Sequence, residues 1–302
     1  MTERHRIWVE HDGGRIAVTQ WGEAVPGRPP ALFLHGTGFV VEVWDEIANA
    51  LVSRYTVYGI DRRGHGASHK PAAGHYHFLD FASDACAVID ALELTDIFGI
   101  GHSAGATDLL LAAPLMPKRF SRLFVMEPTV MNPHSARPDG AAMSEASTAN
   151  VQGTLRRRSE FDSAELAFNR YRAAPAFADW SHDALSVYLQ HGFETLPDGR
   201  VQLLCRPEIE AAMLRPIFEA MEQVYAGDHR GNPFASLAGI QCPVCVATAE
   251  KSWPIYKEMA ARAVALIPGA SQWAFAGVGH CVAQENPELL LQALEAFENR
   301  RA

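Results

Sequence analysis

The pentapeptide Gly101-His102-Ser103-Ala104-Gly105 restricts the local fold more than any other part of this chain. A short apolar run over residues 97–100 leads into it, and the run 106–113 that follows is typical of a helix. Glycines on both sides of the serine permit a sharp strand-to-helix turn that lifts the serine hydroxyl clear of the backbone. A helix that begins there also directs unpaired N–H groups and its positive dipole end at the serine. The pattern therefore predicts that Ser103 is a catalytic nucleophile.

Strand-like and helix-like stretches alternate along most of the chain. The expected strands are 31–35, 55–60, 97–101, 121–126, 242–248 and 271–276. The expected helices between and after them are 41–53, 78–93, 104–113, 254–265 and 287–298. This alternation predicts an α/β fold with a mostly parallel, doubly wound sheet. Before it, the turn Asp12-Gly13-Gly14 indicates a hairpin of two strands, 5–11 and 15–21.

Three further motifs occur in a fixed order around the serine turn. They are His35-Gly36-Thr37-Gly38, the D-R-x-G-x-G-x-S loop over 61–68, and Gly277-Val278-Gly279-His280. Together with the serine pentapeptide, they resemble the α/β-hydrolase superfamily over nearly the whole chain apart from residues 130–235. The resemblance implies an α/β-hydrolase fold with a serine nucleophile. Dehalogenases and epoxide hydrolases of this fold use an aspartate nucleophile instead, so those activities are not expected.

The stretch 130–235 breaks the alternation. Helical segments are expected at about 159–173, 181–191 and 207–226, with a polar turn at 197–199. Its position after the sixth strand of the main sheet resembles the helical cap of many α/β-hydrolases. We therefore expect a core domain of residues 1–129 and 236–302 with a cap inserted at 130–235. Aromatic residues of this stretch are candidates for substrate contact, although most are expected to pack the cap helices: Phe161, Phe168, Tyr171, Phe177, Trp180, Tyr188 and Phe193.

Nucleophilic acyl transfer needs a base and a carboxylate besides the nucleophile. His280 is the expected base, because it follows the last expected strand on a glycine-rich loop. The acid usually follows the seventh strand in this family, but Ser252 occupies that place here. We favour Glu127 after the sixth strand, since that strand ends beside the strand of the nucleophile. Some relatives, including zearalenone-lactonase-like and certain haloalkane-dehalogenase-like members, place a glutamate there. Glu250 remains the alternative acid.

The oxyanion that forms during acyl transfer should be bound by two backbone N–H groups, those of Thr37 and Ala104. Gly38 is a weaker candidate donor. His35 and His102 are expected to pack behind the site, and the Asp61-Arg62 pair to make a structural loop interaction.

Composition excludes several other classes of function. The net charge of −9 offers no basic footprint for nucleic acid or an anionic membrane. A polar N-terminus and the absence of long apolar runs argue against a secretory signal or a membrane span, and five scattered cysteines suit a reduced, cytoplasmic protein. The Cys242-Pro-Val-Cys245 pair lies in an expected strand whose side chains alternate, so neither a metal nor a redox role is expected. No metal, flavin or nicotinamide cofactor is expected.

The sequence thus predicts a cofactor-free serine hydrolase that cleaves an ester or lactone of a moderately apolar small molecule. Carbon–carbon bond hydrolysis of β-diketone-like substrates and amide hydrolysis use the same triad and stay open. A ligand receptor with little turnover is the alternative from a different class, because some relatives bind hormones. Neither the oligomeric state nor the physiological substrate is predicted.

Overall fold

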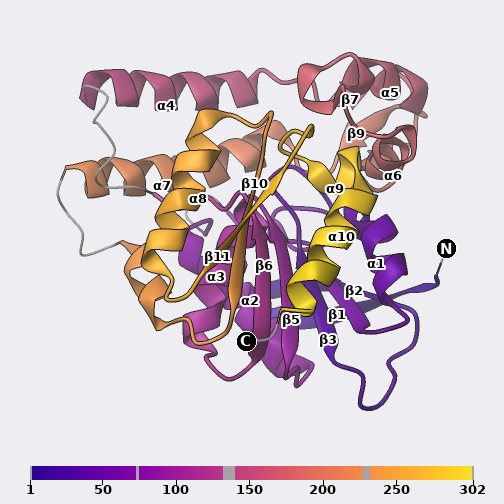
Figure 1. Ribbon diagram of the computed structural model, residues 1–302. Coiled ribbons are helices and arrows are strands. Elements are labelled where there is room, and N and C mark those ends of the chain that lie inside the picture. Colours follow the sequence, from indigo (N-terminus) through magenta and orange to yellow (C-terminus); the bar gives the residue numbers. More distant parts are fainter. Residues whose placement is uncertain (1, 73–74, 132–139, 227–231, 301–302) are drawn as a thin grey trace.

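The computed structural model describes residues 2–72, 75–131, 140–226 and 232–300. Its central sheet has the strand order β1-β2-β4-β3-β5-β6-β10-β11 (Figure 1). The strands are β1 (Arg4–His11), β2 (Gly14–Trp21), β3 (Pro30–Leu34), β4 (Thr56–Ile60), β5 (Ile97–His102), β6 (Phe120–Met126), β10 (Val244–Ala249) and β11 (Ser271–Phe275). Strands β1 and β2 pair antiparallel with their neighbours, and all later pairs are parallel. The expected fold class is confirmed.

Helices cover both faces of this sheet. They are α1 (Asp45–Leu51), α2 (Phe78–Ala91), α3 (Ala104–Leu115), α8 (Pro254–Leu266), α9 (Val282–Glu285) and α10 (Pro287–Glu298), with short 3₁₀ helices at Val41–Trp44 and Pro233–Gly239. Side chains alternate along each strand, so Phe33 of β3 packs with α1 and α10 on one face. Its neighbours Leu32 and Leu34 pack with α2, α3 and α8 on the other. No helix in the described ranges has the length and apolar character needed to cross a membrane.

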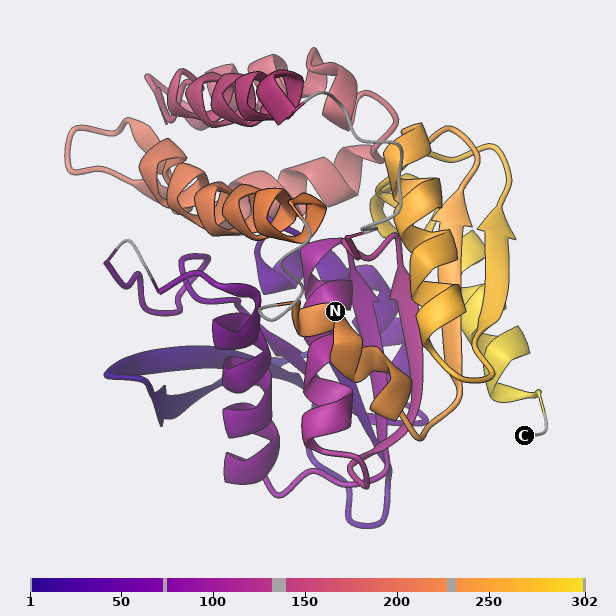
Figure 2. The same cartoon turned by 90° about the vertical axis from the view of Figure 1, so that its left-hand side faces the viewer.

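A second layer lies over the carboxyl ends of the parallel strands, toward which the arrowheads of β10 and β11 point (Figure 2). It contains α4 (Gly140–Leu155), β7 (Glu160–Phe161), α5 (Ala164–Arg172), a 3₁₀ turn (Pro175–Phe177), α6 (His182–Gly192), β8 (Phe193–Thr195), β9 (Val201–Leu203) and α7 (Pro207–Tyr225). Strands β7, β9 and β8 form a small antiparallel sheet. We keep as a proposal the division of the chain into a core (1–129 and 236–302) and a cap (130–235).

Several features of this layer differ from the expectation, among them the strands β8 and β9, which were not expected. The expected helix 159–173 begins instead as β7, because residues 160–161 pair with β9, and helix α5 starts only at Ala164. Helix α4 was not expected, because residues 140–155 are mostly small or polar and carry no apolar stripe at helical spacing.

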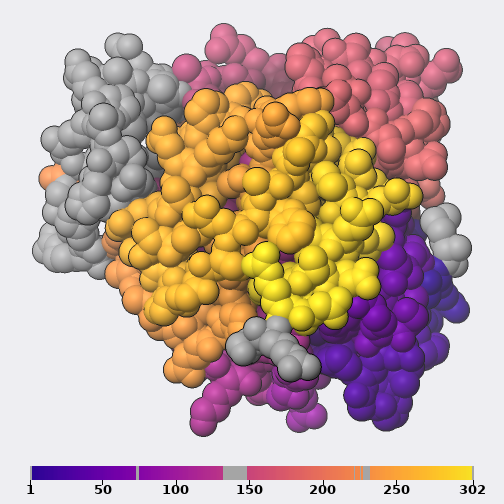
Figure 3. Space-filling model, viewed as in Figure 1, coloured from indigo at the N-terminus to yellow at the C-terminus, as the bar shows by residue number. Residues whose placement is uncertain are grey.

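One of the contacts between this second layer and the layer of the central sheet involves an aromatic residue of the loop after β3. The ring of Phe39 packs against Phe177, Trp180 and Tyr188, with ring centroids 5.2–6.4 Å apart. Most of the expected cap aromatics are buried against each other, as anticipated. The segment around residues 160–190 also lies next to the C-terminal segment on the face shown in Figure 3, where the Ser181 N–H donates to the carbonyl oxygen of Gln284 over 2.9 Å.

Candidate active site

Ser103 stands at the tight turn between β5 and α3. Its backbone has φ 54° and ψ −120°, a conformation that costs energy for a non-glycine residue and is common at functional sites. The neighbouring glycines are needed for close approach. A Cβ at Gly105 would lie 2.4 Å from the carbonyl oxygen of Leu34, and one at Gly101 would lie 2.6 Å from the Cα of Ala106. The Ser103 N–H donates to the carbonyl oxygen of Met126 over 2.8 Å, which ties the turn to the end of β6.

Glu127, which follows β6, faces His280. The Nδ1 of His280 lies 2.5 Å from the Oε2 of Glu127, and the Glu127 side chain is only 2% exposed. Because an ionised carboxylate can only accept, Nδ1 carries the proton and Nε2 keeps a free lone pair. Glu127 also has a positive φ of 48°, so both it and Ser103 hold strained backbone at the same edge of the sheet.

Two further donors hold the carboxylate of Glu127 in place. The Ala249 N–H donates to Oε1 over 2.9 Å, and the Ser252 hydroxyl donates to Oε2 over 2.6 Å. Glu250, the alternative acid, is exposed, and its carboxylate accepts a hydrogen bond from the Gly277 N–H over 2.7 Å. Of the two glutamates, the structure brings Glu127 together with His280, and its burial is compensated by three donors.

The two predicted oxyanion donors belong to segments that both lie close to Ser103. Ala104 is the first residue of α3, and its N–H has no hydrogen-bond partner among the described residues. The Thr37 N–H is likewise unpaired within the described part of the chain. The loop before Thr37 is close to the serine, since a Cβ at Gly36 would lie 3.3 Å from the Cβ of Ser103. The Gly38 N–H, in contrast, already donates to the Nε2 of His65 over 2.9 Å.

Buried polar side chains hold the loop of residues 35–38, which carries Thr37 and is called the predicted oxyanion loop, or oxyanion loop, below. The Nε2 of His35 accepts from the Arg62 N–H over 3.1 Å, and its Nδ1–H donates to the Gly36 carbonyl oxygen over 2.8 Å. Burial lowers the pKa of His35 to about 4, and it lowers the pKa of His65 well below the usual value. Both rings are therefore neutral at pH 7, as their acceptor roles require.

The guanidinium of Arg62 connects the oxyanion loop to helix α3. It donates from Nε to Asp108 over 2.5 Å and reaches the hydroxyl of Thr37 at 3.4 Å. Burial raises the pKa of Asp108 to about 6, which Arg62 opposes. Asp61 binds elsewhere, accepting from the N–H groups of Val41 and Ala67.

His102 connects the serine turn to the loop of the expected base. Its Nε2–H donates to the carbonyl oxygen of His280 over 2.8 Å, and the two rings are 4.5 Å apart. The ring of Phe39 also stacks on that of His102, with an interplanar angle of 13°. Burial lowers the pKa of His102 well below its usual value, so this ring is a neutral support for the site.

Sequence reasoning did not anticipate Tyr256, in the first turn of α8. Its ring stacks on His280 with centroids 4.2 Å apart and an interplanar angle of 20°. The roles of His65 and Asp108 were also not anticipated. These contacts join residues far apart in the chain, and no spacing in the sequence signals them.

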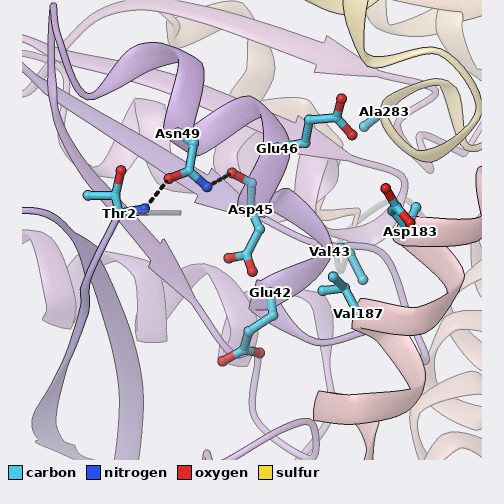
Figure 4. Close-up of a pocket in the computed structure, with 10 residues that line it drawn as sticks. Thr2, Glu42, Val43, Asp45, Glu46, Asn49, Asp183, Val187 and Ala283 are labelled. Atoms are coloured by element: carbon cyan, nitrogen blue, oxygen red, sulfur yellow. Dashed lines mark hydrogen bonds between the residues drawn. The ribbon is translucent and has the colours of Figure 1, made fainter.

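A separate cavity of about 530 Å³ opens beside α1 (Figure 4). It is acidic, with Glu42, Asp45, Glu46 and Asp183 among its lining residues, and none of the predicted site residues lines it. Arg4 and Arg6 pair with Asp45 and Glu42, respectively, so much of this charge is compensated. In the described part of the chain, no group of three or more His, Cys, Asp or Glu residues is arranged to hold a metal ion.

Comparison with known proteins identifies a matching family and a relative that aligns over nearly the whole chain. The model of the Alpha/beta hydrolase family matches residues 31–293. A 2-(acetamidomethylene)succinate hydrolase of Mesorhizobium japonicum is 26% identical over 294 residues, which are 97% of this chain and 95% of the relative.

Two solved structures show the same fold. A crystal structure of E-2-(acetamidomethylene)succinate hydrolase superimposes with a TM-score of 0.78 at 20% identity, covering 99% of this chain and 100% of that one. Est816, described as an N-acyl homoserine lactone degrading enzyme, gives a TM-score of 0.68 at 23% identity, covering 96% and 100%.

Proposed function

Because the chain belongs to the α/β-hydrolase family, we propose that it is a cofactor-independent serine hydrolase acting on an ester or lactone of a moderately apolar small molecule. The observation that carries this proposal is the pairing of Glu127 with His280, whose ring lies 4.5 Å from that of His102, the residue before Ser103. A buried carboxylate 2.5 Å from Nδ1 leaves the opposite imidazole nitrogen free to take the serine proton.

The reaction follows from these positions. Ser103 Oγ attacks the carbonyl carbon while its proton moves to the Nε2 of His280, and Glu127 stabilises the imidazolium that forms. The N–H groups of Thr37 and Ala104 bind the resulting oxyanion. His280 then returns the proton to the leaving oxygen, and an acyl-enzyme remains. Water, deprotonated by the same imidazole, releases the acid and restores Ser103.

Amide hydrolysis is a second candidate for this site. The relative from Mesorhizobium japonicum, whose match spans nearly the whole of both chains, is named for a substrate that bears an acetamido group. Ester and amide cleavage share the attack, the oxyanion and the base, and they differ in the atom that leaves. The name of Est816 supports testing lactones alongside.

Labelling with a fluorophosphonate probe, combined with turnover of p-nitrophenyl esters, tests the proposal. We expect the wild-type protein to be labelled and active, and Ser103→Ala to be neither. Short acyl esters, lactones and N-acetyl amides should then be compared at equal concentration to choose between the substrate classes. A wild-type protein that unfolds cooperatively, yet is not labelled and turns over none of these, would favour the receptor alternative.

The cap is proposed to select the substrate. Replacing residues 140–225 by a short linker should change the order of preference among esters of different size while leaving Ser103 reactive to the probe. An unchanged order would refute this part of the proposal. The five cysteines, all free in the structure, support a reducing compartment such as the cytoplasm.

A further inference from the structure

Tyr256 lies near both residues between which the proton is proposed to pass, Ser103 and His280. It is in the first turn of α8, which follows the loop carrying Ser252. Its ring covers one face of His280, with centroids 4.2 Å apart and an interplanar angle of 20°. Its side chain also reaches that of Ser103, an interaction that lowers the pKa of the phenol. No other described aromatic ring lies as parallel or as close to His280, the nearest others being Trp253 at 6.1 Å and His102 at 4.5 Å.

The phenol is placed to act as a hydrogen-bond donor. Burial raises the pKa of Tyr256, the interaction with Ser103 lowers it, and the nearby charge of Glu127 raises it. The net shift of this pKa is upward, so the hydroxyl keeps its proton at neutral pH. Ser103 must direct its own O–H toward the Nε2 of His280 for the reaction to begin. The remaining lone pairs of Ser103 Oγ are then free to accept from Tyr256.

We propose that Tyr256 is a further catalytic residue, whose hydroxyl donates to Ser103 Oγ and whose ring supports the charged form of His280. The inference rests on the proposed serine hydrolase function and names a group that the triad does not include. Tyr256 keeps its proton throughout, and the proton of Ser103 passes to His280 as before. The phenol only stabilises the charge that develops on Oγ.

Both contacts are strongest when charge is present. Negative charge appears on Oγ as the serine is deprotonated for attack, and again as Oγ leaves during release of the acyl group. A donor aimed at that atom stabilises both steps. Positive charge appears on His280 at the same moments, and an aromatic face attracts a cation. Interactions that strengthen in the transition state raise kcat and leave KM nearly unchanged.

Tyr256→Phe tests the hydroxyl and keeps the ring. We expect kcat for a p-nitrophenyl ester and the rate of fluorophosphonate labelling each to fall about tenfold, as for loss of a hydrogen bond to a charged group. KM should stay within about twofold. Tyr256→Leu, which also removes the stacked ring, should lower kcat further. Tyr55→Phe is the matched control, because its hydroxyl donates to Glu298 away from the site, and its kcat should equal that of the wild type.

The outcomes separate this inference from the proposed function. Wild-type kcat and labelling in Tyr256→Phe, with Ser103→Ala inactive, would overturn the role of Tyr256 and leave the hydrolase standing. A fall in kcat matched by a similar rise in KM, or by a lower melting temperature than Tyr55→Phe shows, would assign Tyr256 a structural role and also overturn it. If the wild type itself is neither labelled nor active, the proposed function fails first.

Discussion

The hydroxyl of Ser252 donates a 2.6 Å hydrogen bond to the Oε2 of Glu127, the same oxygen that lies 2.5 Å from His280. The two residues follow neighbouring parallel strands, β10 and β6, whose carboxyl ends meet at one edge of the sheet. In most of the family the acid follows the seventh strand, the position Ser252 holds here. In the proposed triad, the carboxylate therefore comes from the adjacent strand, and Ser252, at the usual acid position, donates a hydrogen bond to it.

Ser252→Ala should weaken this arrangement without abolishing it. Loss of a donor to a buried carboxylate costs about 1.5–3 kcal/mol, and Ala249 still holds the other oxygen. We expect a lower melting temperature and a several-fold lower kcat on a p-nitrophenyl ester. Ser121→Ala is a matched control, since that hydroxyl donates to backbone carbonyls away from the site. Equal turnover in both variants would show that Ser252 does not position Glu127.

Glu127→Gln should lower kcat by about 10³-fold or more. An amide cannot stabilise the imidazolium, and if its NH₂ group faces Nδ1, it favours the wrong tautomer of His280. Glu250→Gln should retain wild-type turnover, since its carboxylate binds the Gly277 N–H instead. Steady-state kinetics of the two variants on one ester decide between the acids. Near-wild-type turnover in Glu127→Gln would remove it from the triad.

The position of Ser252 also permits a rescue experiment. The double variant Glu127→Gln, Ser252→Asp places a new carboxylate next to the position of Glu127 Oε2. This carboxylate follows β10, the strand after which most of the family carries its acid. We expect it to regain part of the turnover lost in Glu127→Gln. Ser252→Asp alone should be less active than wild type, because two carboxylates in one buried site repel each other. No recovery in the double variant would mean that only β6 can place the acid correctly.

Buried neutral histidines should make stability depend on pH. Burial lowers the pKa of His35 to about 4 from 6.5, so below pH 6.5 the unfolded chain binds a proton there that the folded protein does not. This stability is complete at higher pH and is lost as the pH falls from 6.5 toward 4. At pH 5 the loss is about 2 kcal/mol. The melting temperature of His35→Gln should therefore change less between pH 7.5 and 5 than that of the wild type. Equal slopes in the two proteins would contradict the assignment.

Predictions from the sequence were most specific for short segments in which both the chemistry and the backbone conformation limit which residues can occur. The core strands and helices end within a few residues of their expected bounds, because apolar runs and turn glycines mark them locally. Ser103 and His280 were proposed from motifs, and Glu127 from its place after the strand beside that of the nucleophile. Helix α4 and strand β7 were not anticipated, because neither has an apolar period of its own. The contacts of Tyr256 and His65 depend on packing between distant segments, which spacing does not encode.

The hydroxyl of Tyr188 gives the last prediction, since it joins the cap to the oxyanion loop. It donates to the carbonyl oxygen of Gly38 over 3.0 Å, is buried, and comes from helix α6. Tyr188→Phe leaves that carbonyl unpaired, which costs about 1–3 kcal/mol, and releases the loop that presents the Thr37 N–H. We expect a lower melting temperature and a several-fold lower kcat. Tyr76→Phe, which loses a 3.0 Å bond to the Pro71 carbonyl oxygen, should change stability alone. If Tyr188→Phe likewise lowers only the melting temperature, the contact holds the cap without ordering the oxyanion loop.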